Sequence, residues 1–400
     1  MSDLKIFTTN IEEKALEQIN TLVSQKAFDN SKIRIMPDVH AGTGCVIGLT
    51  ADLGDKVIPN VVGVDIGCGV LCTCLGDINI DLKKLDDFIK KEIPLGKNVH
   101  INSQYSSVIE EDILKKLYCY NELREINYLT RSLGTLGGGN HFIEVDIDED
   151  NNKYLLIHTG SRNLGKQVAT IYQRKADEYI ENCKDKDIGL QKETLIREYK
   201  ESGKEKEIYN GLQSLKNSLK DNYPPKDLYY LEGDLRDKYL HDMKLCQVFA
   251  SLNRMEIKNR ICKFLNLNNV QDIESVHNYI DNDNMVRKGA ISAHKGEQVV
   301  IPLNMRDGVI LGVGKGNEDW NNSAPHGAGR LLSRTEARKS IKLEEFQESM
   351  QGIYSTSIDY STIDESPMAY KDMNEILYLI KDTVDIKKIL HPIYNIKATE

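Results

Sequence analysis

The feature that most constrains the fold of this 400-residue chain is a change of sequence pattern between about residues 166 and 262. This stretch is rich in Lys, Glu, Leu and Tyr and contains long runs without proline or glycine. QVATIYQRKADEYIENC and LHDMKLCQVFASLNRMEIKNRICKFL carry apolar residues at the spacing of an α-helix. The segment between them, residues 202–227, has the composition of a polar helical arm. We therefore expect a helical insert over about 166–262.

The flanking regions show the opposite pattern, with many glycines and short apolar runs. Residues 31–75 and 275–330 read as strands joined by turns, as do FIEVDID (142–148) and KYLLIHTG (153–160). SRTEARKSIKLEEFQESM and MNEILYLIKDTVDIKKIL near the C-terminus read as helices. Because strands and helices mix without βαβ regularity, we expect an α+β fold. It would form one interwoven domain over residues 1–400, with mixed β-sheets flanked by helices.

Net charge and the distribution of apolar residues exclude some classes of partner and location. The net charge of -9 argues against a protein that coats polyanions in general, although a local basic groove can coexist with it. The N-terminal MSDLKIFTTNIEEK has no apolar signal core, and no apolar run approaches the roughly 20 residues of a membrane span. We therefore expect a cytoplasmic protein with no membrane partner and with mostly reduced thiols on its eight cysteines.

A set of metal-ligand residue types is spread along the chain. Asp65 and Cys68 interrupt the apolar, glycine-rich run VVGVDIGCGV, and a buried aspartate needs a cation or strong donors. His141, His158 and His277 each lie at or beside the edge of a strand-like run. Carboxylate, thiolate and imidazole together suit Zn²⁺, Mn²⁺ or Fe²⁺. The spacing is not that of a short metal finger, so the alternative is that Asp65 caps a turn and Cys68 is a small core residue.

Two glycine-rich segments are suited to phosphate. GTLGGGN (134–140) could expose backbone N–H groups, although no GK[ST] follows as in a Walker A loop. SAPHGAGR places His326 among small residues, and the following RLLSRTEARKS looks helical, which would make HGAG the approach to a helix N-terminus. Arg330, Arg334 and Arg338 would then line one helix face, as a phosphate track or as a solvated surface. In that setting His326 could act as a nucleophile.

Seven motifs, taken in order, resemble those of the RtcB family of RNA ligases. They are MPDVHAGTG, VGVDIGCG, GTLGGGNHF, HTGSR, HNY, HGAGR and DESPMAYKD, and the match covers about residues 31–397. The resemblance implies an enzyme that joins an RNA 3′-phosphate or 2′,3′-cyclic phosphate to a 5′-hydroxyl, in tRNA splicing or RNA repair. It implies GTP as co-substrate, two Mn²⁺ ions as cofactors, a GMP–enzyme intermediate and an activated RNA-ppG end.

The resemblance also implies which residues hold the two metal ions. Asp65, Cys68 and His141 would hold one ion. Cys68, His158 and His277 would hold the second, with the Cys68 thiolate as the bridge.

The remaining site residues follow from the same resemblance. His326 matches the histidine that takes GMP, Asp38 an acidic residue near the centre, and Arg330 an arginine linked to RNA or phosphate handling. The positions that match nucleotide-binding segments are Asn140, His141, Phe142, Ile143, Glu144, Asn278, Pro302, Asn304, Met305, Gly327, Ala328, Gly329, Tyr370 and Lys397.

The chain departs from the family pattern in one nucleotide-binding segment. The family often has IPGSMG followed by a serine, and this chain has IPLNMRDGV at 301–309. Leu303, Asn304 and Val309 stand where glycine and serines usually contact the nucleotide. Asn304 can still form hydrogen bonds, whereas the side chain of Val309 cannot. Thr43 stands where the PDVH motif usually continues with a lysine.

Two other functions compete with the ligase. A two-metal phosphodiesterase or phosphohydrolase acting on RNA ends would need the metals but neither a histidine–GMP adduct nor a guanine pocket. A non-catalytic RNA-binding paralogue should have lost Cys68, His141 or His326, and all three are present. HGAGR and Lys397 favour the ligase.

We further expect contacts to RNA phosphates, a monomeric state and a possible archease-type activator. The candidate phosphate contacts are Arg287, Lys288, Arg330, Arg334, Arg338 and Lys339.

Overall fold

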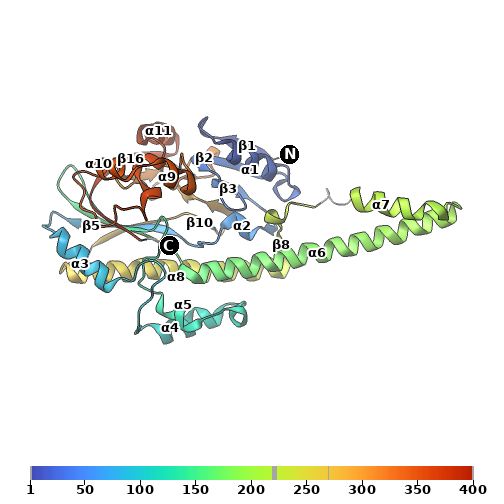
Figure 1. Cartoon of the computed structure of the whole chain (residues 1–400), viewed down its shortest axis with the longest axis horizontal. Coiled ribbons are helices and arrows are strands. Elements are labelled where there is room, and N and C mark those ends of the chain that lie inside the picture. Colours follow the sequence, from blue (N-terminus) through green and yellow to red (C-terminus); the bar gives the residue numbers. More distant parts are fainter. Residues whose placement is uncertain (1, 219–222, 269, 399–400) are drawn as a thin grey trace.

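A seven-stranded antiparallel sheet forms the centre of the molecule in the computed structural model, which describes residues 2–218, 223–268 and 270–398 (Figure 1). Its order is β13–β14–β16–β6–β7–β5–β9. These strands are β5 (Gly69–Gly76), β6 (Phe142–Ile147), β7 (Lys153–Thr159), β9 (Gln271–Val276), β13 (Gln298–Asn304), β14 (Gly308–Gly314) and β16 (Val384–Lys397). The main-chain N–H of Val300 on β13 donates to Ser275 Oγ on β9 at 2.9 Å. Because this bond joins the two outermost strands, the sheet curls back on itself.

The two faces of this sheet bury different sets of side chains, since successive residues of a strand point to opposite faces. Leu155 and Ile157 of β7 pack outward with residues of α3 (Leu82–Glu92) and α8 (Gly233–Phe264). Tyr154 and Leu156 face the inside of the curl, in a cluster with apolar residues of β5, β13 and β14. His158 continues this inner row at the end of the strand, so the fold points its ring into the interior.

A second sheet of five strands lies beside the first, in the order β1–β2–β3–β11–β10. The strands are β1 (Asp3–Ile6), β2 (Lys32–His40), β3 (Ile47–Asp52), β10 (Asn278–Ile280) and β11 (Met285–Lys288), and only β1 and β2 pair in parallel. The remaining described strands form two two-stranded sheets. β4 (Lys56–Val57) pairs with β8 (Leu231–Glu232), and β12 (Ala290–Ser292) pairs with β15 (Ser323–Pro325).

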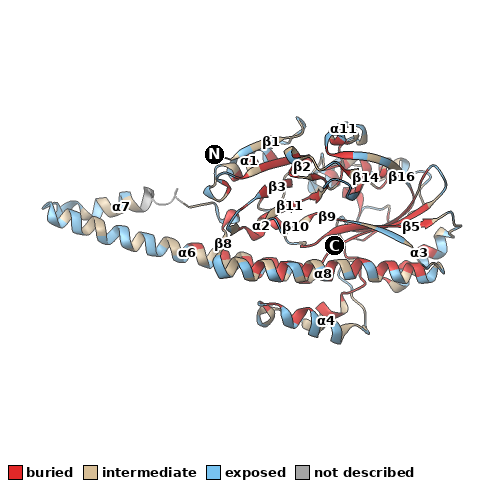
Figure 2. Ribbon diagram, turned by 180° about the vertical axis from the view of Figure 1, so that it is seen from behind, coloured by how far each residue is buried: buried red, intermediate tan, exposed pale blue. Residues whose placement is uncertain are grey.

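The helical insert is confirmed, and its described residues include the long helices α6 (Arg162–Glu201) and α8 and the shorter helix α7 (Ile208–Ser218). α6 runs under the sheets and then projects away from them, α7 folds back on it, and α8 lies along the sheets (Figure 1). The buried residues of α6 end at Ile180, and the projecting part is exposed or half-buried (Figure 2). The arm therefore belongs to the surface rather than to the core.

Shorter helices cover the remaining surfaces. They are α1 (Glu13–Val23), α2 (Pro59–Val62), α4 (Ser106–Asp112), α5 (Ile126–Arg131), α9 (Arg334–Ser340), α10 (Leu343–Ser349) and α11 (Met373–Leu379). The 3₁₀ turns are Lys26–Phe28, Leu114–Lys116, Tyr120–Glu122, Glu205–Glu207, Lys226–Leu228, Glu318–Trp320, Ile363–Glu365, Pro367–Ala369 and Ile380–Asp382. In the part of the chain that the structure describes, no helix has the length and apolar character needed to cross a membrane.

The α+β fold class is confirmed, but two expected C-terminal helices are wrong in extent. The stretch expected to be one helix over 333–350 forms α9 and α10, with a break between them. The last expected helix ends at Leu379, and the sequence from Val384 onward is the strand β16. β16 pairs with β14 on one side and β6 on the other, and these long-range ladders override the local helical spacing.

Candidate active site

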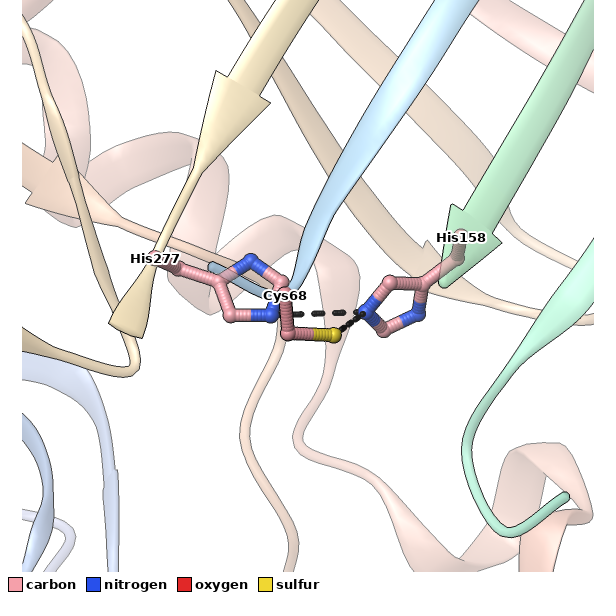
Figure 3. Close-up of side chains that lie close together, drawn as sticks. All are labelled: Cys68, His158 and His277. Carbon is pink, nitrogen blue, oxygen red and sulfur yellow. Dashed lines mark hydrogen bonds between the residues drawn. The ribbon is translucent and has the colours of Figure 1, made fainter. Parts of the chain in front are cut away.

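Three of the expected metal ligands meet at one end of the curled sheet. Cys68 directly precedes β5, His158 lies on β7 and His277 lies between β9 and β10. Because β7 and β9 both pair with β5, the three side chains become neighbours. His158 Nε2 is 3.3 Å from Cys68 Sγ and 3.3 Å from His277 Nε2 (Figure 3). Their ligand atoms all lie within 4.8 Å of one another, which is a suitable arrangement for a metal ion.

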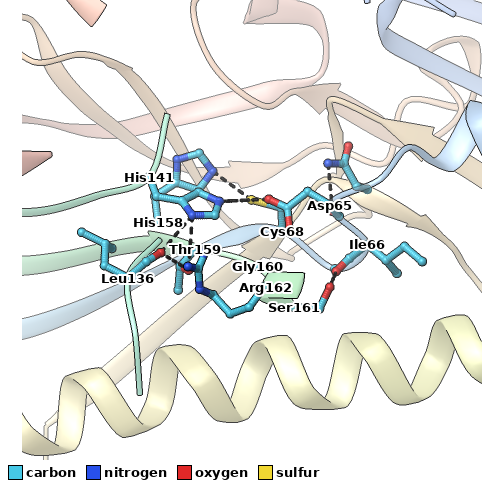
Figure 4. A network of polar contacts seen from close by, with 12 residues as sticks. Asp65, Ile66, Cys68, Leu136, His141, His158, Thr159, Gly160, Ser161 and Arg162 are labelled. Atoms are coloured by element: carbon cyan, nitrogen blue, oxygen red, sulfur yellow. Dashed lines mark hydrogen bonds and ion pairs between the residues drawn. The ribbon is translucent and has the colours of Figure 1, made fainter. Parts of the chain in front are cut away.

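A second ligand group shares the same thiol. Asp65, Cys68 and His141 also have ligand atoms within 4.8 Å of one another. His141 Nε2 is 2.9 Å from Asp65 Oδ2 and 3.5 Å from Cys68 Sγ (Figure 4). The structure thus brings together all five residues expected to bind metal and places Cys68 in both groups.

The chemistry of these donors fits a cation. His141 Nδ1 lies 2.9 Å from the carbonyl oxygen of Leu136, which can only accept, so Nδ1 carries the proton. The Nε2 of a neutral ring then presents its lone pair toward Asp65 and Cys68, two further acceptors that a cation between them would satisfy. Burial holds the pKa values of His158 and His277 well below the usual range, and neutral imidazole is the form that binds metal.

Neighbouring main chain and side chains hold Asp65 in place. Burial alone would raise its pKa, but without a metal ion a protonated His141 ring donates to the carboxylate and brings the pKa down to about 2. The HTGSR segment lies against it: a Cβ at Gly160 would overlap the Asp65 carboxylate, so only glycine fits there (Figure 4). Ser161 Oγ donates to Ile66 O at 2.5 Å, which ties the two loops together.

His326 lies beside His277 of the metal-ligand group that also contains Cys68 and His158. Its ring centroid is 4.8 Å from that of His277. Asp38, which is fully buried on β2, has Oδ2 at 2.7 Å from His326 Nδ1 and accepts the main-chain N–H of His326 at 3.0 Å. A carboxylate at Nδ1 places the ring proton there and leaves Nε2 as the free nitrogen. The side chain of His326 is 17% exposed, so a ligand can reach it.

A cavity of about 770 Å³ opens at His326. Its polar lining includes Glu144, Asn395 and Lys397 from the curled sheet, together with Arg330 and Glu365. A cavity of this volume can hold a nucleotide-sized ligand, with charged groups of both signs on its wall.

Comparison with known proteins places these features in a family. A sequence model described as "tRNA-splicing ligase RtcB" matches residues 18–126 and 118–398. The RNA-splicing ligase RtcB of Escherichia coli strain K12 is 30% identical over 426 residues, covering 97% of this chain and 95% of that protein. The tRNA-splicing ligase RtcB of Methanococcus maripaludis is 27% identical, with 94% and 89% covered. The chain belongs to the RtcB family.

Most of the positions that match the family's nucleotide-binding segments do line the cavity. They are Asn140, Phe142, Glu144, Pro302, Asn304, Met305, Gly327, Ala328, Gly329, Tyr370 and Lys397. His141 is the metal-ligand candidate described above. Two positions lie elsewhere: the side chain of Ile143 packs outward in the core, and Asn278 donates to Asp65 O at 3.2 Å and accepts from Gly289 N at 3.0 Å. Ile143 can therefore contact a nucleotide only through its main chain.

The departure from the RtcB pattern forms the hairpin turn between β13 and β14. Asn304 Oδ1 accepts the main-chain N–H groups of Arg306 at 3.0 Å and Asp307 at 2.9 Å, and its Nδ2 donates to Asp307 Oδ2 at 2.7 Å. Oδ1 and one Nδ2 hydrogen of Asn304 are therefore used within the turn, and the second Nδ2 hydrogen is left for a ligand. Val309 is fully buried in the apolar cluster inside the curl.

The expected helix start at HGAG is wrong. α9 begins at Arg334, where Ser333 accepts from Glu336 N and the Glu336 side chain accepts from Ser333 N, forming a capping box. Arg330 precedes the helix and forms an isolated bridge with Tyr370. The S-x-x-E signal of a capping box was present in the sequence and locates the true start.

The three arginines converge on an acidic pair that the sequence reading missed. Arg330 pairs with Glu365 at 3.2 Å, Arg334 with both Asp364 and Glu365 at 2.7 Å, and Arg338 with Asp364 at 3.2 Å. Both acids are almost fully buried. Both acids lie in the motif DESPMAYKD, and their place beside its tyrosine and lysine could have indicated them as site residues.

Two of the expected RNA-phosphate contacts are not available to RNA. Lys288 is buried and donates to the carbonyl oxygens of Thr43, Cys45 and Asn60 at 2.9–3.2 Å. Arg287 is buried as well and donates to Asp281 at 2.6 Å and to Ser323 and Tyr279. Both cations hold the five-stranded sheet against its neighbours.

Proposed function

We propose that this protein is a GTP-dependent RNA ligase that joins an RNA 3′-phosphate or 2′,3′-cyclic phosphate end to a 5′-hydroxyl end. The observation that carries the proposal is the position of His326, held at Nδ1 by Asp38 beside the group of Cys68, His158 and His277 and at a cavity of nucleotide size. Membership of a family whose relatives are named as RNA- and tRNA-splicing ligases supports it. We propose tRNA splicing or RNA repair as the process.

In the first step, the free Nε2 of His326 attacks the α-phosphorus of GTP. A nitrogen–phosphorus bond forms, the bond to the β-phosphate oxygen breaks, and pyrophosphate leaves. The imidazole gains positive charge as it attacks, and the buried carboxylate of Asp38 stabilises that charge through Nδ1. Nδ1 keeps its proton throughout.

The second and third steps move GMP and then release it. A cyclic phosphate end is first opened by water to a 3′-phosphate. An oxygen of the 3′-phosphate attacks the phosphorus on His326, so the nitrogen–phosphorus bond breaks and an RNA-ppG end forms. The RNA 5′-hydroxyl then attacks the 3′-phosphorus, loses its proton and displaces GMP.

Two divalent ions, which we take to be Mn²⁺, would be held by Asp65, Cys68 and His141 and by Cys68, His158 and His277. When bound, they would supply Lewis-acid stabilisation of charge on the phosphate oxygens. Arg330, at the cavity wall, supplies fixed positive charge for the same oxygens. A cytoplasmic location, a monomeric state and an archease-type activator remain predictions.

The competing function is a two-metal phosphodiesterase or phosphohydrolase acting on RNA ends. The same metal groups would serve it, but it has no use for a histidine held at Nδ1 by a buried carboxylate at the mouth of a nucleotide-sized cavity.

A labelling experiment tests the proposal. The protein is incubated with GTP radiolabelled at the α-phosphate and with Mn²⁺, then denatured. We expect label that survives alkali and is lost in acid, as for a phosphoramidate, and that is absent in His326→Ala and Cys68→Ala. Absence of label under every divalent metal would contradict the ligase, and label from ATP in place of GTP would contradict the guanine assignment.

A further inference from the structure

Asp146 is a carboxyl group with no hydrogen-bond donor. It lies on β6, is fully buried inside the curled sheet, and no donor among the described residues reaches either of its oxygens. Its cross-strand neighbours are Tyr154 on β7 and Pro392 on β16. The Tyr154 hydroxyl donates to Asp148 at 3.0 Å instead, and proline has no N–H. An ionised carboxylate in this apolar interior would be very costly.

The group that faces Asp146 is Glu144, two residues earlier on the same face of β6. Glu144 accepts a hydrogen bond from Asn395 Nδ2 on β16 and is almost fully buried. Glu144 and Asn395 both line the cavity at His326, whereas Asp146 lies behind them. Two buried carboxyl groups close enough to share a hydrogen bond cannot both ionise, so they share a proton.

The surroundings decide which of the two acids holds that proton. Burial and the neighbouring Glu144 raise the pKa of Asp146 well above its usual range. Burial also raises the pKa of Glu144, but the hydrogen bonds from Asn395 and Asp146 and the charge of Lys397 oppose this rise. From β5, the Cys72 thiol faces Asp146, and burial holds its pKa so high that it stays neutral. Asp146 is therefore the acid and Glu144 its acceptor.

We propose that Asp146 is a neutral carboxylic acid that donates a hydrogen bond to Glu144 and so positions it to accept the N–H donors of a guanine base. The inference rests on the proposed function, because it names the residue that sets the base preference of the nucleotide cavity. Guanine offers N1–H and N2–H side by side, and an ionised carboxylate accepts both, whereas adenine has an acceptor at N1. Asp146 acts only through Glu144 and is a positioning residue.

Two substitutions of near-equal volume separate this role from simple packing. Asp146→Asn keeps a neutral donor toward Glu144, and Asp146→Val removes it. The measurement is the ratio of GTP label to ATP label on the protein at neutral pH. We expect Asp146→Asn to keep the wild-type ratio and Asp146→Val to lower it about tenfold, the value of a hydrogen bond to a charged group. Melting temperatures show whether each variant is folded.

Glu144→Gln provides the second arm. If Asp146 acts through Glu144, then Asp146→Val has no further effect on the ratio once Glu144 is Gln. An unchanged ratio in Asp146→Val overturns the inference while leaving the ligase intact. A loss in Asp146→Asn equal to that in Asp146→Val also overturns it, because Asp146 would then act as a carboxylate, for example toward a cation.

An infrared measurement needs no nucleotide and therefore does not depend on the proposed function. The wild type at neutral pH should show the carbonyl stretch of a protonated carboxylic acid, and Asp146→Asn should remove it. If this band is missing in the folded wild type, Asp146 is ionised and the inference is wrong. Failure of the wild type to take label from GTP, with the band present, would instead contradict the proposed function.

Discussion

The carboxylate of Asp38 accepts hydrogen bonds from three N–H groups of the loop that carries His326. One oxygen, Oδ2, lies 2.7 Å from His326 Nδ1 and accepts the main-chain N–H groups of His326 at 3.0 Å and Gly327 at 3.3 Å. Side chain and main chain are thus fixed by a single buried group. The ring can neither turn over nor move its proton to Nε2 without losing this contact.

We predict that Asp38→Asn slows labelling of the protein by GTP roughly a hundredfold or more, because the amide stabilises neither the charge nor the tautomer of His326. The measurement is the initial rate of label incorporation. Asp55→Asn, a change at an exposed aspartate, is the matched control and should label at the wild-type rate. A wild-type rate in Asp38→Asn would contradict the role of this contact.

We predict that substituting the shared thiol removes more metal than substituting a ligand of one group alone. Because Cys68 belongs to both ligand groups, Cys68→Ala should lose both ions, whereas His277→Ala should lose one and keep the group of Asp65, Cys68 and His141. Co²⁺ titration with its thiolate absorption, together with metal analysis, measures this. Cys74→Ala, a thiol outside both groups, should bind as the wild type does. Two ions retained in Cys68→Ala would be inconsistent with a bridging thiolate.

Glu365 predicts a pH-dependent contribution to stability. Burial would raise its pKa, but Lys397, Arg334 and Arg330 outweigh it and lower the pKa to about 2 from 4.5. A lowered folded-state pKa stabilises the fold above the unfolded pKa, and the contribution is lost as pH falls from about 4.5 toward about 2. Glu365→Gln should therefore lose about 3 kcal/mol at neutral pH.

Chemical denaturation of both proteins at several pH values checks this. The difference in unfolding free energy between wild type and Glu365→Gln should shrink as the pH drops below about 4.5. A difference that stays constant over this range would show that the Glu365 carboxylate is not what the three cations stabilise.

We predict that a side chain at Gly329 displaces the loop that carries His326. The φ of Gly329 is +78°, and a Cβ there would overlap the main chain of Asp38. Gly329→Ala should therefore displace the His326 loop and slow GTP labelling about tenfold. Gly352→Ala, at φ +91° with open space around it, carries the same backbone strain of about 1 kcal/mol without the overlap. If both variants label at the wild-type rate, the loop is not held by this contact.

The sequence predicted strands at the centre of the fold, and the structure brings the five expected metal-ligand residues together. FIEVDID and KYLLIHTG are β6 and β7, so the interpretation of these short runs as strands is confirmed, and His158 lies near the end of its strand. The five metal-ligand residue types stood out because polar groups in apolar, glycine-rich runs need a partner. The residue types alone could not show that Cys68 belongs to both groups, since that depends on strand register, and only the resemblance to the RtcB family implied it.

The errors have a common physical origin in long-range contacts. The segment from Val384 has helical spacing but becomes β16, because β6 and β14 offer ladders on both sides. The RNA role expected for Lys288 came from its charge, and its partners are three carbonyl oxygens from distant loops. The sequence does not distinguish Asp146 from other strand residues, because its lack of a hydrogen-bond donor is visible only in the folded structure.

A joining reaction with a marked phosphate tests the ligase most directly. Two RNA fragments, one ending in a 3′-phosphate labelled with ³²P and one beginning with a 5′-hydroxyl, are incubated with the protein, GTP and Mn²⁺. We predict a longer product in which the label resists phosphatase, because the 3′-phosphate becomes the junction, and no such product with His326→Ala. Release of the label as inorganic phosphate without joining would contradict the ligase and support a phosphohydrolase.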